Sequence, residues 1–178
     1  QGSFFGEMSL LSGRRRSATV FAGDNCVVIE TPRRTMNKLI ASVDAVKRVL
    51  DQTFIVRTIQ QKFAPENSIE ELMPVAENTV INQFRPGEVI FGEGDEGDTL
   101  HFIRSGSVTI SSSQQGKDVI MSYVPANQAV GEMALLGDTV RSATATATVK
   151  TETLSINRES FDILMDTAVG LRDRMEKI

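Results

Sequence analysis

The sequence holds very few of the side chains on which disulfides, zinc sites and catalytic triads depend. Its 178 residues include one cysteine, Cys26, and one histidine, His101. A single cysteine forms no internal disulfide, and one cysteine with one histidine cannot assemble a Cys/His zinc site. A Ser-His-Asp triad would require that one imidazole. We therefore expect no metal site and no enzymatic activity.

A surplus of basic residues and a long apolar run are also lacking. The net charge is −4, so we expect no nucleic-acid binding by this chain, because neutralising phosphates needs a basic face. No apolar run approaches the roughly 18 residues that span a bilayer, and the N-terminus lacks a signal-peptide pattern. We predict a cytoplasmic location. The chain begins with Gln1 rather than Met, which suggests a fragment.

An internal repeat organises the rest of the sequence. Residues 6–19, GEMSLLSGRRRSAT, align with residues 131–144, GEMALLGDTVRSAT, at an offset of 125 with nine of fourteen positions identical. The same offset continues without a gap as far as Ser42 and Thr167. Chance would not keep one register over so long a stretch, so the chain contains two copies of one module.

The two copies are unequal in length. Residues 64–130 precede the second block, whereas only five residues precede the first. We therefore predict two domains. Residues 1–62 would hold the C-terminal half of a first module, with its motif, two strands and long helices. Residues 63–178 would hold a nearly complete second module. The upstream half of the first was either removed or is supplied by another chain.

The second module shows an all-β pattern with flanking helices. Turn signals recur every 8–12 residues, which is typical of a β-barrel or jelly-roll. The predicted strands are 79–84, 89–91, 99–103, 107–111, 118–124, 142–149 and 152–156.

Helices are predicted on both sides of this barrel. Thr31 would cap a helix with Pro32 at its first position, and helical apolar spacing continues to Lys62 with a break at Ser42. Ser68 to Glu71 is a capping-box pattern. Pro74 should cut or bend that helix. Asn157 would cap the last helix.

The repeated block suits the binding of a sugar phosphate. Gly131 and Glu132 begin a single helical turn over 132–136, whose free N–H groups attract an anion. Arg141 can add a guanidinium, which holds phosphate through paired charge-assisted bonds. The carboxylate of Glu132 suits a hydroxyl donor such as a ribose.

This motif, Gly-Glu-x-(Ala/Ser)-Leu-Leu, four residues and Arg-Ser-Ala, resembles the phosphate-binding cassette of cyclic nucleotide-binding domains. That family includes bacterial catabolite activators and regulatory subunits of cAMP-dependent protein kinase. Three upstream segments fit the same resemblance: 84–91, 94–98 and 103–108. Many members carry proline just before the arginine, where this chain has Arg15 and Val140.

The resemblance implies a ligand, cAMP or cGMP, and a role for each cassette residue. Glu132 would bind the ribose 2′-hydroxyl and Arg141 the cyclic phosphate, with backbone amides and Ser142 adding contacts. The implied ligand-binding residues are Gly131, Glu132, Met133, Ala134, Arg141, Ser142 and Ala143. The matching residues of the first copy are Gly6, Glu7, Met8, Ser9, Arg16, Ser17 and Ala18.

The function implied is that of a regulatory module that couples nucleotide binding to helix rearrangement, with no cofactor. Leu171, Arg172 and Met175 are candidates to cover the base. The regulated effector would lie outside this chain, and a homo-oligomer stays open. The alternative is a degenerate domain that keeps the motif and acts as an interaction module without nucleotide. A separate alternative is that Glu132 and Arg141 form a structural ion pair that closes a loop.

Overall fold

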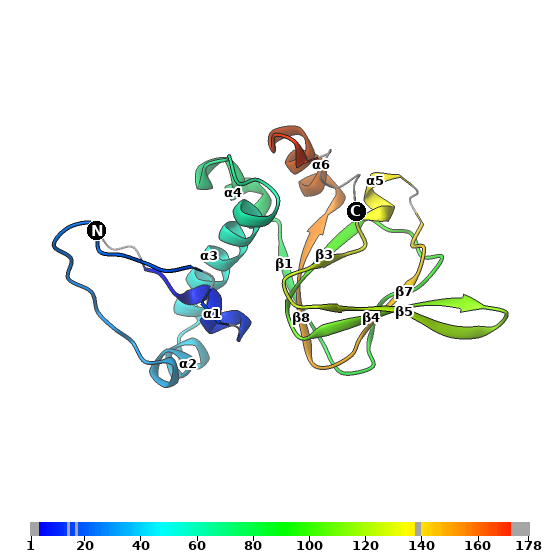
Figure 1. Ribbon diagram of the computed structural model, residues 1–178, viewed down its shortest axis with the longest axis horizontal. Coiled ribbons are helices and arrows are strands. Elements are labelled where there is room, and N and C mark those ends of the chain that lie inside the picture. The colour runs from blue at the N-terminus through cyan, green and yellow to red at the C-terminus, as the bar shows by residue number, and fades with distance from the viewer. Residues whose placement is uncertain (1–3, 14, 17, 138–139, 172–178) are drawn as a thin grey trace. The chain divides into compact units, whose positions relative to one another are not determined.

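The structure is a computed structural model that describes residues 4–13, 15, 16, 18–137 and 140–171 (Figure 1). Its chain divides into two compact units, Gln1–Phe54 and Ile55–Ile178. The division falls inside helix α3, Asp44–Lys62. The reason is packing in the second unit, where Phe63, just after this helix, meets the ring of Phe102 edge to face at 6.2 Å.

The second unit contains two four-stranded sheets, which confirms the predicted mainly-β fold with flanking helices (Figure 1, green to orange). One sheet has the strand order β1-β8-β3-β6, and the other has the order β2-β7-β4-β5. The strands are β1 Val80–Phe84, β2 Val89–Phe91, β3 Thr99–Ser105, β4 Ser107–Gln114, β5 Lys117–Pro125, β6 Ala129–Val130, β7 Thr144–Ala147 and β8 Thr151–Asn157.

All seven strands predicted for this unit are present, with changes at their ends. The predicted strand 142–149 is reduced to β7, which pairs only with β2 and β4. Strand β6 was not predicted, because it has two residues and so shows no periodicity. It pairs with β3, placing Val130 opposite His101 immediately before the repeated block.

The capping box of α4, Ile69–Glu77, forms as predicted. The Ser68 side chain accepts a hydrogen bond from the Glu71 amide, and the Glu71 side chain accepts one from the Ser68 amide. Of the two effects that we expected of Pro74, a cut or a bend, the cut does not occur, because Pro74 lies inside this helix. Leu72 and Val75 are fully buried on either side of it, and their packing offsets the lost backbone bond.

The last described helix, α6, runs from Arg158 to Thr167, with Asn157 as its N-cap as predicted. The Asn157 side chain accepts a hydrogen bond from the Ser160 amide at 2.9 Å. Phe161 and Leu164 are buried. The side-chain amide of Asn67, just before α4, donates to the backbone carbonyl of Thr167 at the end of α6 at 3.3 Å. Helix α6 is thus anchored in the second unit at both ends.

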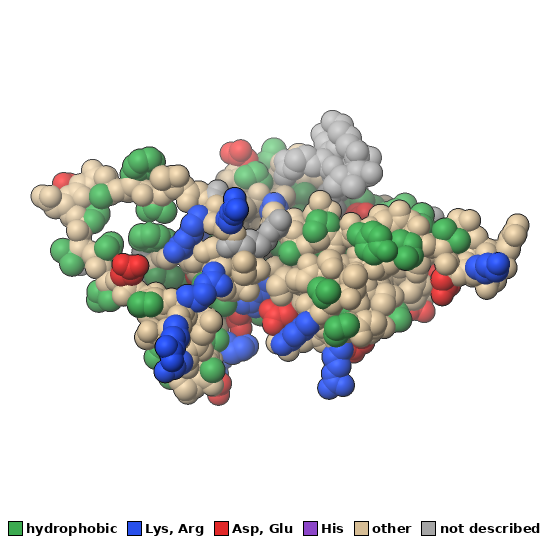
Figure 2. Space-filling view, turned by 60° about the horizontal axis from the view of Figure 1, so that its bottom comes forward, with side chains coloured by type: hydrophobic (Ala, Val, Ile, Leu, Met, Phe, Trp, Pro, Cys, Tyr) green, Lys and Arg blue, Asp and Glu red, His purple; other side chains and the backbone are tan. Residues whose placement is uncertain are grey.

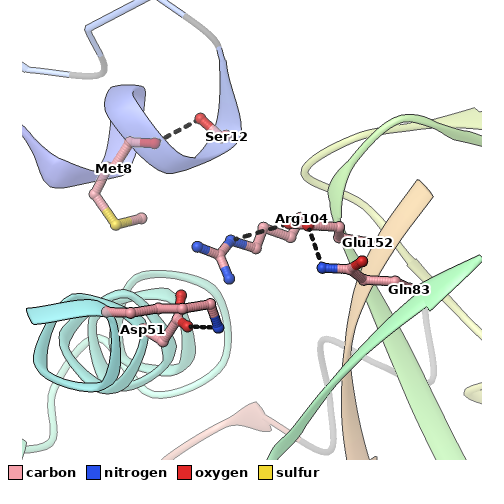
Figure 3. Close-up of polar contacts among 7 residues, drawn as sticks. Met8, Ser12, Asp51, Gln83, Arg104 and Glu152 are labelled. Carbon is pink, nitrogen blue, oxygen red and sulfur yellow. Dashed lines mark hydrogen bonds and ion pairs between the residues drawn. The ribbon is translucent and has the colours of Figure 1, made fainter. Parts of the chain in front are cut away.

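Polar side chains on three adjacent strands of the first sheet contact one another (Figure 3). Glu152 of β8 accepts a hydrogen bond from Gln83 of β1 at 3.0 Å. Its other carboxylate oxygen lies 3.8 Å from Nε of Arg104 on β3. One carboxylate therefore joins the three adjacent strands.

The first unit holds α1, Glu7–Ser12, α2, Arg33–Ser42, and the beginning of α3. The predicted break at Ser42 is confirmed. The N-cap of α2 is Pro32, so the predicted cap at Thr31 is wrong. Ser42 does not cap α3 either, because its hydroxyl donates back to the Lys38 carbonyl at 2.7 Å.

The two strands predicted for the first copy are not formed among its described residues, since positions 18–32 contain no strand. Their repeat counterparts are β7 and β8. Ile29 is 94% exposed, whereas its counterpart Leu154 is 0% exposed, and Val20 is 58% exposed against 0% for Ala145. Hydrophobic side chains accordingly lie at the surface of this extended segment (Figure 2). A strand needs a neighbouring strand to hydrogen-bond to, and residues 18–32 pair with none of the strands in the described part of the chain.

His101 makes folding of the second unit sensitive to acid. Nδ1 of this buried ring lies 3.0 Å from the Ser155 hydroxyl and 3.3 Å from that of Thr153. Burial, aided by the positive charge of Arg141 and opposed by Asp98, lowers the pKa of His101 from 6.5 to about 4. The depressed pKa means that the contribution of His101 is fully present above pH 6.5 and is lost as the pH falls towards 4.

We expect the wild-type protein to lose about 3 kcal/mol more unfolding free energy between pH 7 and pH 4 than His101→Gln. Urea unfolding at pH 7, 6, 5 and 4 measures the difference. The variant is the control for carboxylates that titrate in the same range. Parallel curves for the two proteins would contradict a neutral, buried His101.

Candidate functional site

The second copy of the repeated block forms a loop between β6 and β7. Its helical turn is α5, Met133–Leu136, with Glu132 as N-cap, close to the predicted 132–136. The carbonyl of Glu132 accepts hydrogen bonds from the amides of Leu135 and Leu136, both at 3.0 Å. The amides of Met133 and Ala134 belong to the first turn, where a helix offers no internal acceptors. They are therefore suited to receive an anion.

Glycine is the one residue type that fits at position 131, the start of this loop. Its φ is 89°, in the region that favours glycine. A Cβ there would collide with the guanidinium of Arg141 and lie 3.2 Å from the carbonyl oxygen of Thr99. The lack of a side chain at Gly131 therefore lets the guanidinium of Arg141 lie against the backbone.

Arg141 is the central side chain of the loop and is only 4% exposed. Its Nη1 donates to the Gly131 carbonyl at 2.8 Å, and its Nη2 donates to the Thr99 carbonyl at 2.6 Å. The guanidinium carbon lies 4.1 Å from the ring centroid of Phe91, a cation–π geometry. The Nε atom is buried and has no hydrogen-bond partner in the described part of the chain.

Acidic side chains surround this buried cation. Burial lowers the pKa of Arg141, and the charges of Asp98, Asp95 and Glu132 oppose that shift. The pKa of Asp98 is lowered, mainly by the hydrogen bond that it accepts from the Thr99 hydroxyl at 2.6 Å, and also by the charges of Arg141 and Arg158. Arg141 stays protonated at neutral pH.

The structure brings most of the predicted residues of the second copy together. Ser142 donates a weak hydrogen bond to the Met133 sulfur at 3.8 Å. Ala134 and Ala143 are buried, and Glu132 is half-buried. Within the described residues, no ion pair joins Glu132 directly to Arg141, whose Nη1 and Nη2 donate to backbone carbonyls. The arrangement therefore does not support a closing ion pair between them.

Sequence reasoning missed three contributors to this site. Phe91 and Thr99 contact Arg141, and the negative charge of Asp98 opposes the lowering of the Arg141 pKa by burial. Part of the acidic turn formed by residues 92–98 was matched to the family, over 94–98, but none of its residues was assigned to the site. Two backbone bonds tie it to the site, from the Gly94 amide to the Arg141 carbonyl at 2.9 Å and from the Arg141 amide to the Asp95 carbonyl at 2.8 Å.

The first copy forms part of the same geometry. Gly6 has a φ of 93°, and Nη1 of Arg16 donates to its carbonyl at 3.1 Å, as Arg141 does to Gly131. Met8 and Ser9 lie on α1, and Glu7 is buried. Arg16 and Ala18, however, are exposed, unlike Arg141 and Ala143. Ser17 lies outside the described residues.

A cavity of about 560 Å³ adjoins this partial cassette within the first unit. Mostly apolar side chains line it, together with Glu7 and Arg16; they include Phe4, Phe5, Leu10, Ile29, Val46 and Leu50.

The predicted base-covering residues are only partly described. Leu171 is buried at 2% exposure, and Arg172 and Met175 lie outside the described residues. Among the helices that the structure describes, none has the length and hydrophobicity needed to cross a membrane. The described side chains also contain no cluster of His, Cys, Asp and Glu able to hold a metal ion.

Comparison with known proteins finds the same module. The family model described as "Cyclic nucleotide-binding domain" matches residues 1–43 and 81–168. A cAMP-dependent protein kinase regulatory subunit of Eremothecium gossypii is 27% identical, over 94% of this chain and 35% of its own length. A cGMP-dependent protein kinase of Plasmodium berghei is 30% identical, over 93% of this chain and 18% of its own length.

Solved structures agree on the fold. The regulatory domain of Toxoplasma gondii PKA, solved with cAMP, matches with a TM-score of 0.64 and 24% identity, over 97% of this chain and 65% of that chain. This chain spans about a third of the length of the first curated relative and less than a fifth of the second. The family model nevertheless covers well over half of its residues, and the chain belongs to the cyclic nucleotide-binding domain family.

Proposed function

We propose that the second cassette binds a cyclic nucleotide, cAMP or cGMP, and that the chain serves as a regulatory module. The observation that carries this proposal is the buried Nε of Arg141, which lacks a hydrogen-bond partner in the described residues beside the first turn of α5. A buried donor on a cation is costly unless an acceptor reaches it. A phosphate oxygen would supply that acceptor.

The cyclic phosphate would lie between Arg141 and the amides of Met133 and Ala134, with the Ala143 amide and Ser142 adding contacts. Two kinds of donor then converge on one anion: a guanidinium and helix N–H groups. Gly131 supports this placement because it allows the guanidinium to lie against the backbone.

The ribose would be held by Glu132. Its carboxylate accepts no hydrogen bond from the described residues, and it is half-buried beside the cation. A carboxylate next to a phosphate site suits a hydroxyl donor, since it would repel a second anion. The relatives include both cAMP- and cGMP-dependent kinase proteins, so the identity of the base stays open between the two.

The output of the module is proposed from the relatives alone. Several are named as kinase regulatory subunits, which favours an effector outside this chain and a module without catalysis of its own. The competing function, a degenerate domain that acts without nucleotide, predicts no heat of binding with either nucleotide. Isothermal titration calorimetry with cAMP and cGMP distinguishes the two.

We also propose that the chain carries two unequal copies of the module. The sequence repeat and the matched contacts at Gly6 and Gly131 support this arrangement. The exposure of Ile29, beside the burial of Leu154, supports the view that the first copy needs further strands. A segment equivalent to residues 80–130 would cover this face.

Arg141→Ala should weaken nucleotide binding by about 2–5 kcal/mol, because a buried phosphate would lose its charge partner. This corresponds to roughly 30-fold to several thousandfold in affinity by calorimetry. Arg85→Ala, which removes an exposed arginine in a turn, is the matched control and should leave affinity unchanged. An Arg141→Ala protein that is folded by circular dichroism and binds like wild type would exclude this site.

Glu132→Ala should cost less, on the order of 1.5–3 kcal/mol, the value of one charged hydrogen bond. The partner of that bond can be tested with 2′-deoxy-cAMP, which lacks the ribose hydroxyl. Wild type should lose a similar amount with the analogue, and the variant should lose little more. If the two losses add in full, Glu132 does not bind the 2′-hydroxyl.

The full chain should bind one nucleotide, in the second copy. Arg16 is exposed where Arg141 is buried, so its cation lacks the low-dielectric setting that makes such a contact strong. A calorimetric stoichiometry near one is expected, with Arg16→Ala matching wild type. Two equivalent sites per chain would refute this and would mean that a second chain completes the first copy.

A further inference from the structure

Arg158 links the binding loop to the helix that follows the barrel. It is the first residue of α6, and its Nη2 donates to the Ala134 carbonyl at 2.9 Å and to the Gly97 carbonyl at 3.3 Å. Its Nη1 reaches the Leu135 carbonyl at 3.4 Å. One side chain from α6 therefore contacts both the cassette turn α5 and the acidic turn.

Both ends of this link adjoin Arg141. A Cβ placed on Gly97 would collide with Cβ of Ala134 and lie 2.9 Å from Nε of Arg141, so the backbone of Gly97 packs between them. The acidic turn is also hydrogen-bonded to the backbone of Arg141 through Gly94 and Asp95. A shift of Arg141 toward an anion would therefore disturb the carbonyls that Arg158 holds.

The same contact occurs in the first copy. Arg33, the counterpart of Arg158 at the offset of 125, is the first residue of α2, and its Nη2 donates to the Ser9 carbonyl at 3.0 Å. Ser9 is the counterpart of Ala134. The contact exists in the first unit although residues 18–32 form no strand there, so it belongs to the cassette and its following helix and does not depend on the barrel.

The position of both arginines breaks a local rule. A cation in the first turn of a helix opposes the helix dipole, and acidic residues are favoured there. Arg158 and Arg33 nevertheless occupy the first position of α6 and α2. The compensation lies in the repeated block, where the short helices α5 and α1 leave their last carbonyls without internal donors and the guanidinium supplies donors to them. Such local conflicts concentrate at functional sites.

We propose that Arg158 is the positioning residue that transmits nucleotide binding from the cassette to α6, without contacting the nucleotide. This inference rests on the proposed function. Phe161 and Leu164 are buried in the core, and the Asn67 side chain donates to the carbonyl of Thr167 at the end of α6. A displacement of Arg158 therefore acts on a helix whose other contacts hold it in place.

The test compares wild type with Arg158→Ala and with Arg158→Met, which keeps most of the aliphatic length and lacks the donors. Calorimetry with cAMP and cGMP gives affinity, and amide hydrogen exchange of residues 159–167 with and without the nucleotide that binds gives the response of α6. Wild type should show a nucleotide-dependent change. Both variants should bind within about tenfold of wild type and lose most of that change, while Arg85→Ala keeps it.

Three results would overturn the inference alone. The first is a full nucleotide response of α6 in both variants, since a merely structural Arg158 would alter exchange equally with and without nucleotide. The second is a loss of affinity beyond about tenfold in both variants, which would make Arg158 a ligand-binding residue. The third is nucleotide binding by wild type with no change in α6. Absence of any binding by wild type would overturn the proposed function as well.

Discussion

The burial of one cation, the guanidinium of Arg141, constrains much of the second unit. A buried charge is tolerated only when its donors are satisfied and opposite charges lie near. Two donors of Arg141 go to the carbonyls of Gly131 and Thr99, its face lies on Phe91, and Asp98 and Asp95 balance its charge. These partners come from β2, β3, the acidic turn and the cassette. The barrel therefore has to close correctly for the cation to be accommodated.

The same buried cation determines which kind of ligand the site favours. The acidic side chains around Arg141 oppose the effect of burial on its pKa, but they do not place an acceptor on Nε. A monoanion that enters beside the first turn of α5 adds both an acceptor and a compensating charge. A neutral ligand would bring only part of this, which favours a phosphate diester over an uncharged sugar or base.

Local patterns predicted much of this molecule. The strand predicted at 142–149 formed as the shorter β7, the Ser68 and Asn157 caps formed, and the repeat led to the loop that contains Arg141. Features that depend on packing or on long-range pairing were missed. The two-residue strand β6 has no pattern of its own, Pro74 is tolerated because its neighbours are buried, and Phe91, Asp98 and Thr99 reach Arg141 only through strand register. Thr31 was expected as a cap because its residue type favours that position, yet the helix starts one residue later.

The two occurrences of the repeated block separate what its own residues determine from what the surrounding sheets add. The bonds from Arg16 to Gly6 and from Arg33 to Ser9 form in a unit whose residues 18–32 make no strand. Short-range chemistry alone therefore brings the arginine to the glycine and the following helix to the turn. These short-range contacts do not bury the arginine by themselves, since Arg16 is exposed, whereas Arg141 is only 4% exposed. An arginine in water holds a phosphate weakly, whereas the same group in a low-dielectric wall holds it strongly. In the proposed site, the fold would thus supply the affinity for phosphate, whereas the cassette provides the contacts of its arginine with the glycine and of the following helix with the turn.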